Sequence, residues 1–89
     1  MSVEGVPSTL VHSFGLGVRD LRKARGWSQE RLAEISNLNR SYIGEIERGS
    51  VIASLVTVEK LALALKLTPS ALLVRSEARD DAGHRAGPA

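Results

Sequence analysis

The sequence predicts an all-α fold: a compact bundle of five short helices that contains a helix-turn-helix. Aliphatic residues recur at helical spacing between residues 14 and 74, and residues that begin or end helices stand between the periodic segments. Aromatic residues make up only 3% of the chain, whereas hydrophobic residues make up 43%. The core is therefore expected to be aliphatic, which favours packed helices, and 89 residues are enough for one small domain.

The first helix is predicted to end at Gly26. Phe14, Val18 and Leu21 lie at spacings of four and three residues, which places them on one helical face. Residues 1–12, which precede this pattern, combine Gly, Pro and Ser with small apolar residues and have no clear period. We expect residues 1–12 to form a flexible arm and residues 13–74 to form the folded domain.

The second helix is predicted from about Gln29 to Ser36, with Ser28 as its N-cap. Trp27, just before the cap, can pack on Leu32 four positions after it, the arrangement called a hydrophobic staple. Stacking on a nucleic-acid base is the alternative role for this sole tryptophan. The side chains expected in the core are Leu32, Ala33 and Ile35.

The third helix is predicted from about Arg40 to Arg48, with Ile43 and Ile46 inward. Only the three residues NLN separate it from the second helix, and so tight a turn leaves two helices crossed at a steep angle. The small Ala33 suits a close contact at the crossing, and Asn37 tolerates the positive φ of such a turn. The crossing exposes one helix as a ridge, which fits a DNA major groove about 12 Å wide.

Two further helices complete the predicted bundle. Ser54 can cap a fourth helix that runs to about Leu65. Thr68 with Pro69 opens a short fifth helix, because Pro suits the first helical position. Residues 75–89 are polar and carry almost no large apolar side chains, so we expect a disordered tail there. The inward residues of the fourth helix are expected to be Leu55, Val58, Leu61 and Leu65.

Composition argues against several classes of protein. The chain has no cysteine, so neither a disulfide framework nor a zinc-thiolate site is available. No apolar run approaches the roughly 18 residues of a membrane-spanning helix, and no secretion signal is evident, so a soluble, cytoplasmic protein is expected. His12 and His84 fall in segments expected to be flexible, and no metal-spaced cluster or phosphate-binding loop is present. We therefore expect no enzyme activity, metal, cofactor or small-molecule ligand.

Three motifs carry a resemblance to a known family. SQERLA (28–33), NLNRSYIGEIERG (37–49) and SLVTVEKLALALKLTPSALL (54–73) are similar to the phage-repressor-type (lambda-repressor-like) helix-turn-helix family, also called the xenobiotic-response-element family. The resemblance covers about residues 14–74, and SNLNRSYIGEIERG particularly resembles the controller proteins of restriction-modification systems. Many members have Gly where this chain has Asn37. The resemblance implies a transcriptional regulator that binds double-stranded DNA.

The resemblance also implies which residues meet DNA. Gln29 would contact a backbone phosphate, or else remain a solvated first-turn residue. Arg40 and Ser41 match positions that read base edges, and the Arg fork can bond guanine O6 and N7 together. Contact with phosphate alone is the alternative for Arg40. The full implied DNA-binding set is Gln29, Asn39, Arg40, Ser41, Tyr42, Glu45 and Arg48.

For several residues of the third helix, the sequence leaves two interpretations open. Tyr42 either donates its hydroxyl to phosphate or packs. Glu45 either accepts from cytosine N4 or pairs with Arg48 three residues later, and the pairing is favoured. Gly44 costs about 1 kcal/mol relative to Ala inside a helix, so a close approach by a helix or by DNA is expected there.

The basic residues of the first helix are also open to more than one interpretation. The family pattern pairs Glu47 with Arg22, and such an ion pair would be structural rather than DNA-binding. Arg19, Lys23 and Arg25 form either a phosphate-facing patch or a solvated helix face. The formal charge of the whole chain is +2, which permits an anionic partner without requiring one.

A single recognition helix reads only a few base pairs, so a symmetric homodimer on a palindromic operator is expected, with half-sites about 34 Å apart. Within DNA binding, a restriction-modification controller is one specific possibility. An antitoxin, or another module that binds protein rather than DNA, is the alternative from a different class. The expected dimer interface, half of which could be ordinary core, is Val51, Ile52, Leu55, Val56, Leu72, Leu73 and Val74.

Overall fold

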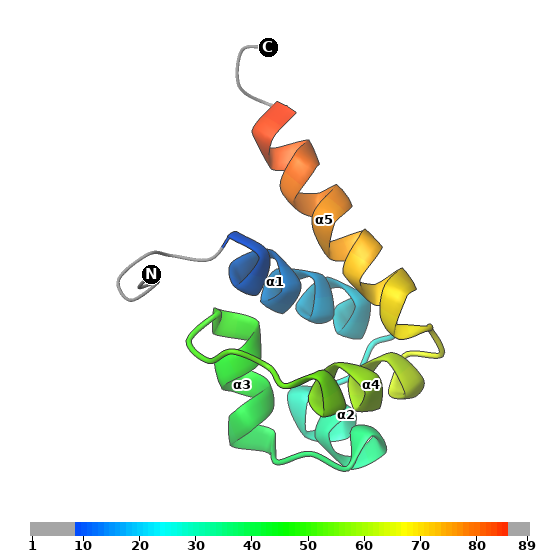
Figure 1. Ribbon diagram of the computed structural model, residues 1–89. Helices are drawn as coiled ribbons and strands as arrows, with labels where there is room; N and C mark the ends of the chain where they lie inside the picture. Colours follow the sequence, from blue (N-terminus) through cyan, green and yellow to red (C-terminus); the bar gives the residue numbers. More distant parts are fainter. Residues whose placement is uncertain (1–8, 86–89) are drawn as a thin grey trace.

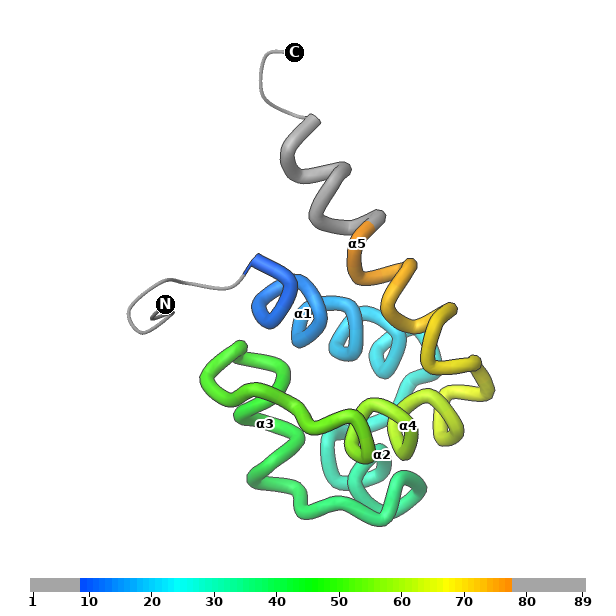
Figure 2. Tube along the Cα trace, in the orientation of Figure 1, coloured from blue at the N-terminus to red at the C-terminus, as the bar shows by residue number. Residues whose placement is uncertain are grey.

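All five helices that the sequence predicts are present, so the all-α fold is confirmed. The computed structural model describes residues 9–85, with side chains to residue 77, and no strand occurs in that range. Figure 1 shows α1 between α5 on one side and α2, α3 and α4 on the other. In the trace of Figure 2, the chain returns from α3 to α4, which packs against α2. The helices are α1 (Thr9–Ala24), α2 (Gln29–Ser36), α3 (Arg40–Arg48), α4 (Leu55–Ala64) and α5 (Pro69–Arg85).

The helical region is longer at both ends than the sequence predicts. Helix α1 begins at Thr9, so residues 9–12, which we assigned to the arm, are helical. Leu10 and Val11 line an apolar cavity together with Phe14, and this packing accounts for the early start. The rest of the predicted arm, residues 1–8, lies outside the described residues.

The predicted disordered tail is wrong over most of its length. Helix α5 continues to Arg85, so residues 75–85 are helical and the fifth helix is not short. Ser76 is fully buried, and its Oγ would lie 3.1 Å from a Cβ placed on Gly17 of α1. This close contact with α1 stabilises α5 beyond the point where the apolar pattern of α5 ends. Residues 86–89 lie outside the described residues.

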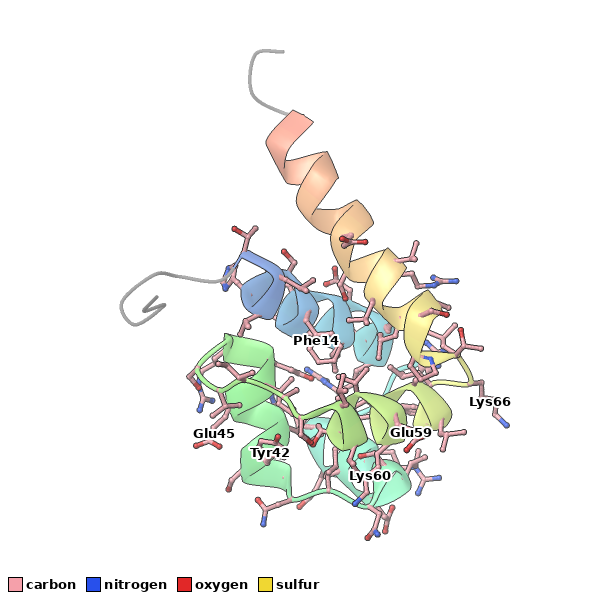
Figure 3. The ribbon with its side chains drawn as sticks, viewed as in Figure 1. Phe14, Tyr42, Glu45, Glu59, Lys60 and Lys66 are labelled. Carbon is pink, nitrogen blue, oxygen red and sulfur yellow. The ribbon has the colours of Figure 1, made fainter. Side chains whose placement is uncertain are left out.

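The core is aliphatic, with Phe14 as its only fully enclosed ring among the described residues. Figure 3 shows Phe14 reaching from α1 toward α4. Two predicted core residues are wrong. Ile35 is 38% exposed because the adjacent Ser36 turns inward, and Leu55 is 83% exposed because it lies in the first turn of α4. The buried hydrophobic residues are Phe14, Val18, Leu32, Ala33, Ile43, Ile46, Val58, Leu61, Ala62, Ala64, Leu65 and Leu72.

All four turns between helices have the same backbone bonds. The turn after α3, with Gly49 at positive φ, continues into the exposed Ser50, whereas the other three pack their next residue on the core. In each of these three, a residue with positive φ follows the helix: Gly26, Asn37 and Lys66. The backbone N–H of the following residue donates to the carbonyl five positions earlier, the pattern of a Schellman motif. That following residue packs on the core in all three turns, as Trp27, Leu38 and Leu67 do. The next residue in each turn, Ser28, Asn39 or Thr68, bonds a backbone N–H in the first turn of the next helix.

Candidate nucleic-acid interface

Helix α3 has one buried face and one exposed edge. Ile43 and Ile46 are enclosed in the core, and Glu47 is 5% exposed. Arg40 and Ser41 are exposed at the opposite side of the helix. Figure 3 shows Tyr42 and Glu45 projecting from α3, and both are half-buried. The helix is therefore fixed from behind while its polar edge remains open.

The expected ion pair between Arg22 and Glu47 is present behind α3. Arg22 Nε donates to Glu47 Oε2 at 2.7 Å, and Arg22 Nη2 donates to Oε1 at 3.0 Å. Nη1 donates to the carbonyl of Trp27 at 2.8 Å, so the guanidinium also holds the α1–α2 turn. Its hydrogen bond to Glu47 raises the pKa of Arg22, against the opposing effect of burial, so this group stays charged.

Gln29 joins this network from α2. Its Nε2 donates to Glu47 Oε1 at 3.0 Å, which fixes the orientation of the amide. One hydrogen of the amide nitrogen is used in this bond, and the second is free by valence to donate to another acceptor. Gln29 thus braces α3, and its expected phosphate contact stays a prediction.

The start of α3 is organised by Asn39. Its Oδ1 accepts from the backbone N–H of Ser41 at 2.7 Å and from that of Tyr42 at 3.4 Å. Asn39 is thus an N-cap, and only its amide NH₂ is left for DNA. No hydrogen bond or ion pair within the described part of the chain involves the side chain of Arg40.

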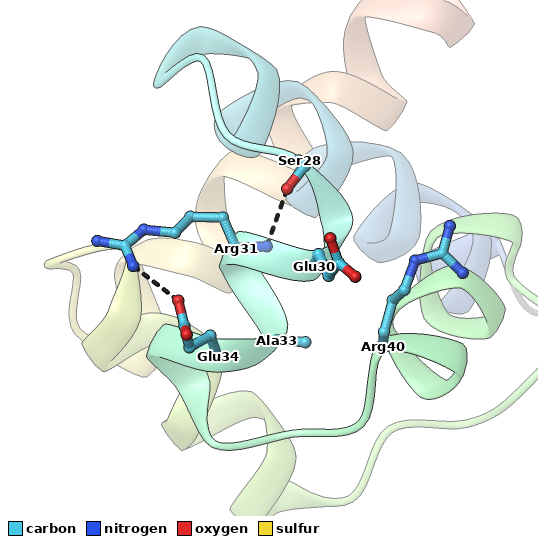
Figure 4. Close-up of a pocket in the computed structure, with 6 residues that line it drawn as sticks. All are labelled: Ser28, Glu30, Arg31, Ala33, Glu34 and Arg40. Carbon is cyan, nitrogen blue, oxygen red and sulfur yellow. Dashed lines mark hydrogen bonds and ion pairs between the residues drawn. The ribbon is translucent and has the colours of Figure 1, made fainter.

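Arg40 stands at the edge of an open groove between α2 and α3. Figure 4 shows its guanidinium on one side of the groove and Glu30 on the other. Arg31 and Glu34, which also line the groove, form an exposed ion pair at 2.7 Å. The groove has a volume of about 520 Å³ and is lined by Ser28, Glu30, Arg31, Ala33, Glu34 and Arg40. Glu30 and Arg31 carried no sequence signal for this position.

A second cavity, of about 270 Å³, lies between α1, α2 and α3. Arg19 and Lys23, two members of the predicted basic patch, line it together with Arg48. The third member, Arg25, has a structural role instead. It donates to the carbonyl of Leu65 at 2.6 Å, and its guanidinium lies 5.7 Å from the centroid of the Trp27 ring.

Residues 18–72 match the family model described as Helix-turn-helix. The chain belongs to the helix-turn-helix family. The resemblance found in the sequence is thereby confirmed, and α2, the three-residue turn and α3 form the unit that gives the family its name.

Among similar proteins are three control proteins. Control protein C.SmaI of Serratia marcescens is 42% identical over 66 residues, which cover 74% of this chain and 79% of that protein. The restriction-modification controller protein C.AhdI from Aeromonas hydrophila, known from a crystal structure, is 52% identical in sequence. The match covers 71% of this chain and 94% of the C.AhdI chain, with a TM-score of 0.66. The controller protein C.Esp1396I, solved as a tetramer in complex with its natural 35 base-pair operator, is 27% identical and covers 82% of this chain and 96% of its own, with a TM-score of 0.75.

Within the helix-turn-helix, the structure tests one alternative each for Tyr42 and Glu45, while their contacts with DNA stay predictions. The Tyr42 hydroxyl lies 3.2 Å from Thr57 Oγ1 on α4, so this side chain ties α3 to α4. The favoured pairing of Glu45 with Arg48 is wrong, because no ion pair joins them among the described residues. Arg48 instead folds over Gly44, with Nη1 3.2 Å from the position of a Cβ there.

Gly44 provides this space without contacting a helix backbone. The nearest atoms to a Cβ at this position are Arg48 Nη1 and the amide of Gln29, both ends of flexible side chains. The expected close approach by a helix is therefore wrong, and an approach by DNA stays a prediction. Gly15 of α1, which sequence reasoning missed, is the closer contact, because a Cβ there would overlap the carbonyl oxygen of Ile46.

The predicted dimer interface divides into surface and core. Leu72 is fully buried and cannot form an interface, because it packs between α5 and the other helices. Val51 and Leu73 are half-buried against the core. They line an apolar cavity of about 220 Å³ with Leu10, Val11, Phe14, Ile52, Ala53, Leu55 and Val58. The interface candidates with exposed side chains are Ile52, Leu55, Val56 and Val74.

Three remaining features of the chain are the length and apolarity of its helices, its possible metal ligands and its two histidines. Neither α1 nor any other helix in the described range is long and apolar enough to cross a membrane. Within the same residues, no group of three or more His, Asp or Glu side chains is positioned to bind a metal ion. His12 packs beside Gly49 at the end of α3, and the side chain of His84 lies outside the described residues.

Proposed function

We propose that this protein is a sequence-specific transcriptional regulator that binds double-stranded DNA as a homodimer, with α3 in the major groove. A regulator of this kind acts in the cytoplasm, by where it sits on a promoter. The observation that carries the proposal is the exposed N-terminal edge of α3. Arg40 and Ser41 are open to solvent there, while the ion pair of Glu47 with Arg22 fixes the helix from behind.

The chemistry of that edge suits base recognition. An unpaired Arg at the start of a helix can reach guanine O6 and N7 with two parallel hydrogen bonds. Asn39, already committed to capping, presents the helix N-terminus at a fixed position. Helix dipoles and exposed N–H groups at such a position also favour the negatively charged DNA backbone.

Selection of bound fragments from random double-stranded DNA tests this function. We expect enrichment of a palindromic sequence whose half-sites lie about one helical turn, or 34 Å, apart. A set of bound fragments with the same base composition as the starting pool would contradict sequence-specific binding. Co-purification of a stoichiometric protein partner together with that result would favour the protein-binding alternative.

The homodimer is proposed to form through the exposed apolar side chains beside the 220 Å³ cavity. Leu55 is 83% exposed and Ile52 81% exposed, so their burial would remove much apolar surface from water. We expect Leu55→Glu to give a monomer under sedimentation at micromolar concentration, without loss of folding. Leu63→Glu is the matched control, because Leu63 is 72% exposed on the same helix but does not line the cavity. A monomeric wild type would contradict the homodimer.

A restriction-modification controller is the more specific candidate. The similarity to two control proteins, at 42% and 52% identity, favours it. Genes for a methyltransferase and a nuclease next to the gene of this protein, with a binding site upstream of them, would support this role. A binding site only at unrelated promoters would leave a general regulator.

A further inference from the structure

We propose that the cavity between α1, α2 and α3 is a seat for a phosphate of the DNA backbone, so that α1 takes part in DNA binding. The inference rests on the proposed function, and it adds Arg19 and Lys23 to the residues that meet DNA. Three helices contribute to the seat: Arg19 and Lys23 from α1, Gln29 from α2 and Arg48 from α3.

The charge of the cavity favours an anion. Its lining includes four basic side chains, Arg19, Arg22, Lys23 and Arg48, and one acidic side chain, Glu47. Glu47 is neutralised by the two hydrogen bonds from Arg22. None of the other three cations forms an ion pair within the part of the chain that the structure describes.

Two of these cations lie close together on one helix. Arg19 and Lys23 are four residues apart on α1, a spacing at which like charges repel each other. Both side chains are exposed, so they can move toward an incoming anion. A phosphate placed between the helices would remove the repulsion and accept hydrogen bonds from both.

Gly44 places the third cation. Because it has no side chain, Arg48 can lie over it, and a Cβ there would be 3.2 Å from Arg48 Nη1 and within 3.9 Å of the Gln29 amide. Arg48 is thereby kept beside Gln29, at the mouth of the cavity, rather than beside Glu45.

The position of the cavity fits the path of the backbone. Arg40 and Arg48 are eight residues apart, which is about 12 Å along an α-helix. The major groove is also about 12 Å wide, so a helix of this length that crosses the groove and presents Arg40 to base edges has its other end at the groove rim. The phosphates run along that rim, and the cavity lies at that end of α3.

The salt dependence of DNA binding tests the phosphate seat. We expect Arg19→Gln and Lys23→Gln each to make the fall of log K with log salt concentration less steep. The change is about 0.9 for every phosphate that the protein ceases to neutralise, and so reaches at most about 1.8 for a symmetric dimer. The order of preference among DNA sequences should not change, and the melting temperature should match the wild type. Arg75→Gln is the matched control, because Arg75 is exposed on α5 and does not line the cavity.

The outcomes separate this inference from the function on which it rests. If the wild type binds DNA and Arg19→Gln and Lys23→Gln keep its slope and affinity, as Arg75→Gln should, the phosphate seat is wrong and the proposed function stands. If either variant alters the preferred sequence instead, that residue reads bases and the seat is again wrong. Absence of DNA binding by the wild type would contradict the function itself.

Discussion

The α2–α3 turn and the α4–α5 turn have the same backbone bonds but present the next helix differently. The N–H of Leu38 donates to the carbonyl of Ala33 at 2.9 Å, and the N–H of Leu67 donates to that of Ala62 at 2.8 Å. Each bond encloses a residue with positive φ, Asn37 at 57° and Lys66 at 61°. Local turn chemistry therefore does not distinguish the recognition helix from the last helix.

Helices α3 and α5 differ in the side chains that pack against their inner faces. The back of α3 combines Ile43 and Ile46 with the buried carboxylate of Glu47, which receives three hydrogen bonds. The described part of α5 is held by Leu72 and by the contact of Ser76 with Gly17. Both helices are fixed, but only α3 keeps a row of polar side chains free at its start. Packing, rather than the turn, therefore decides which helix has an edge that can contact a partner.

The largest expected effect comes from removing the charged support of α3. Glu47→Ala should lower the free energy of unfolding by about 3 to 5 kcal/mol, because it leaves the guanidinium of Arg22 buried without its partner. Urea denaturation followed by circular dichroism measures this change.

Glu34→Ala is the matched control for Glu47→Ala. It breaks the ion pair with Arg31, whose side chain is 57% exposed, and such surface pairs contribute at most about 1 kcal/mol. Equal effects of the two substitutions would mean that the buried pair does not support α3. On the α5 side, Leu72→Ala should cost about 2 to 5 kcal/mol through the cavity it leaves.

The N-caps give a smaller, paired comparison. Asn39→Ala and Thr68→Ala each remove a side chain that accepts from a backbone N–H, and each should destabilise by about 1 kcal/mol. Only Asn39→Ala should also weaken DNA binding, because it loosens the exposed start of α3. Thermal melts and DNA titrations of the two variants make the test, and a matching loss of DNA affinity in Thr68→Ala would contradict the distinction.

The smallest expected effect compares the turns themselves. Lys66→Gly should stabilise the protein by up to about 1 kcal/mol, because glycine adopts positive φ without the strain of a side chain. Asn37→Gly should gain less, since Asn tolerates this backbone region better than Lys. The midpoints of chemical denaturation rank the two. A larger gain at Asn37 would show that its turn is the more strained.

The bounds of α2 and α3 were predictable to the residue from the sequence. Ser28, Asn39 and Gly49 mark helix ends by their own chemistry, so no distant contact is needed. The length of α5 was not predictable, because Ser76 is polar and is buried only through its contact with α1. The exposure of Ile35 was missed for a related reason, since eight residues of helix leave the direction of the buried face ambiguous.

The site was predictable only in part. The partners Arg22 and Glu47 came from the family resemblance, and they are 25 residues apart in the chain. The structural role of Arg25 depends on the carbonyl of Leu65, 40 residues away. The sequence alone could not show this contact, so it grouped Arg25 with Arg19 and Lys23. Likewise, the cavity that unites Lys23 with Arg48 exists only after α1 and α3 have packed together.

The central claim is that the exposed edge of α3 enters the major groove and that Arg40 reads a base there. Selection from random DNA with the wild type and with Arg40→Ala in parallel tests it most directly, with Arg31→Ala as a control of equal charge. We expect Arg40→Ala to lose preference at one position in each half-site and about 1 to 3 kcal/mol of affinity for the selected sequence. A uniform loss of affinity for all sequences, with every preference intact, would contradict the claim.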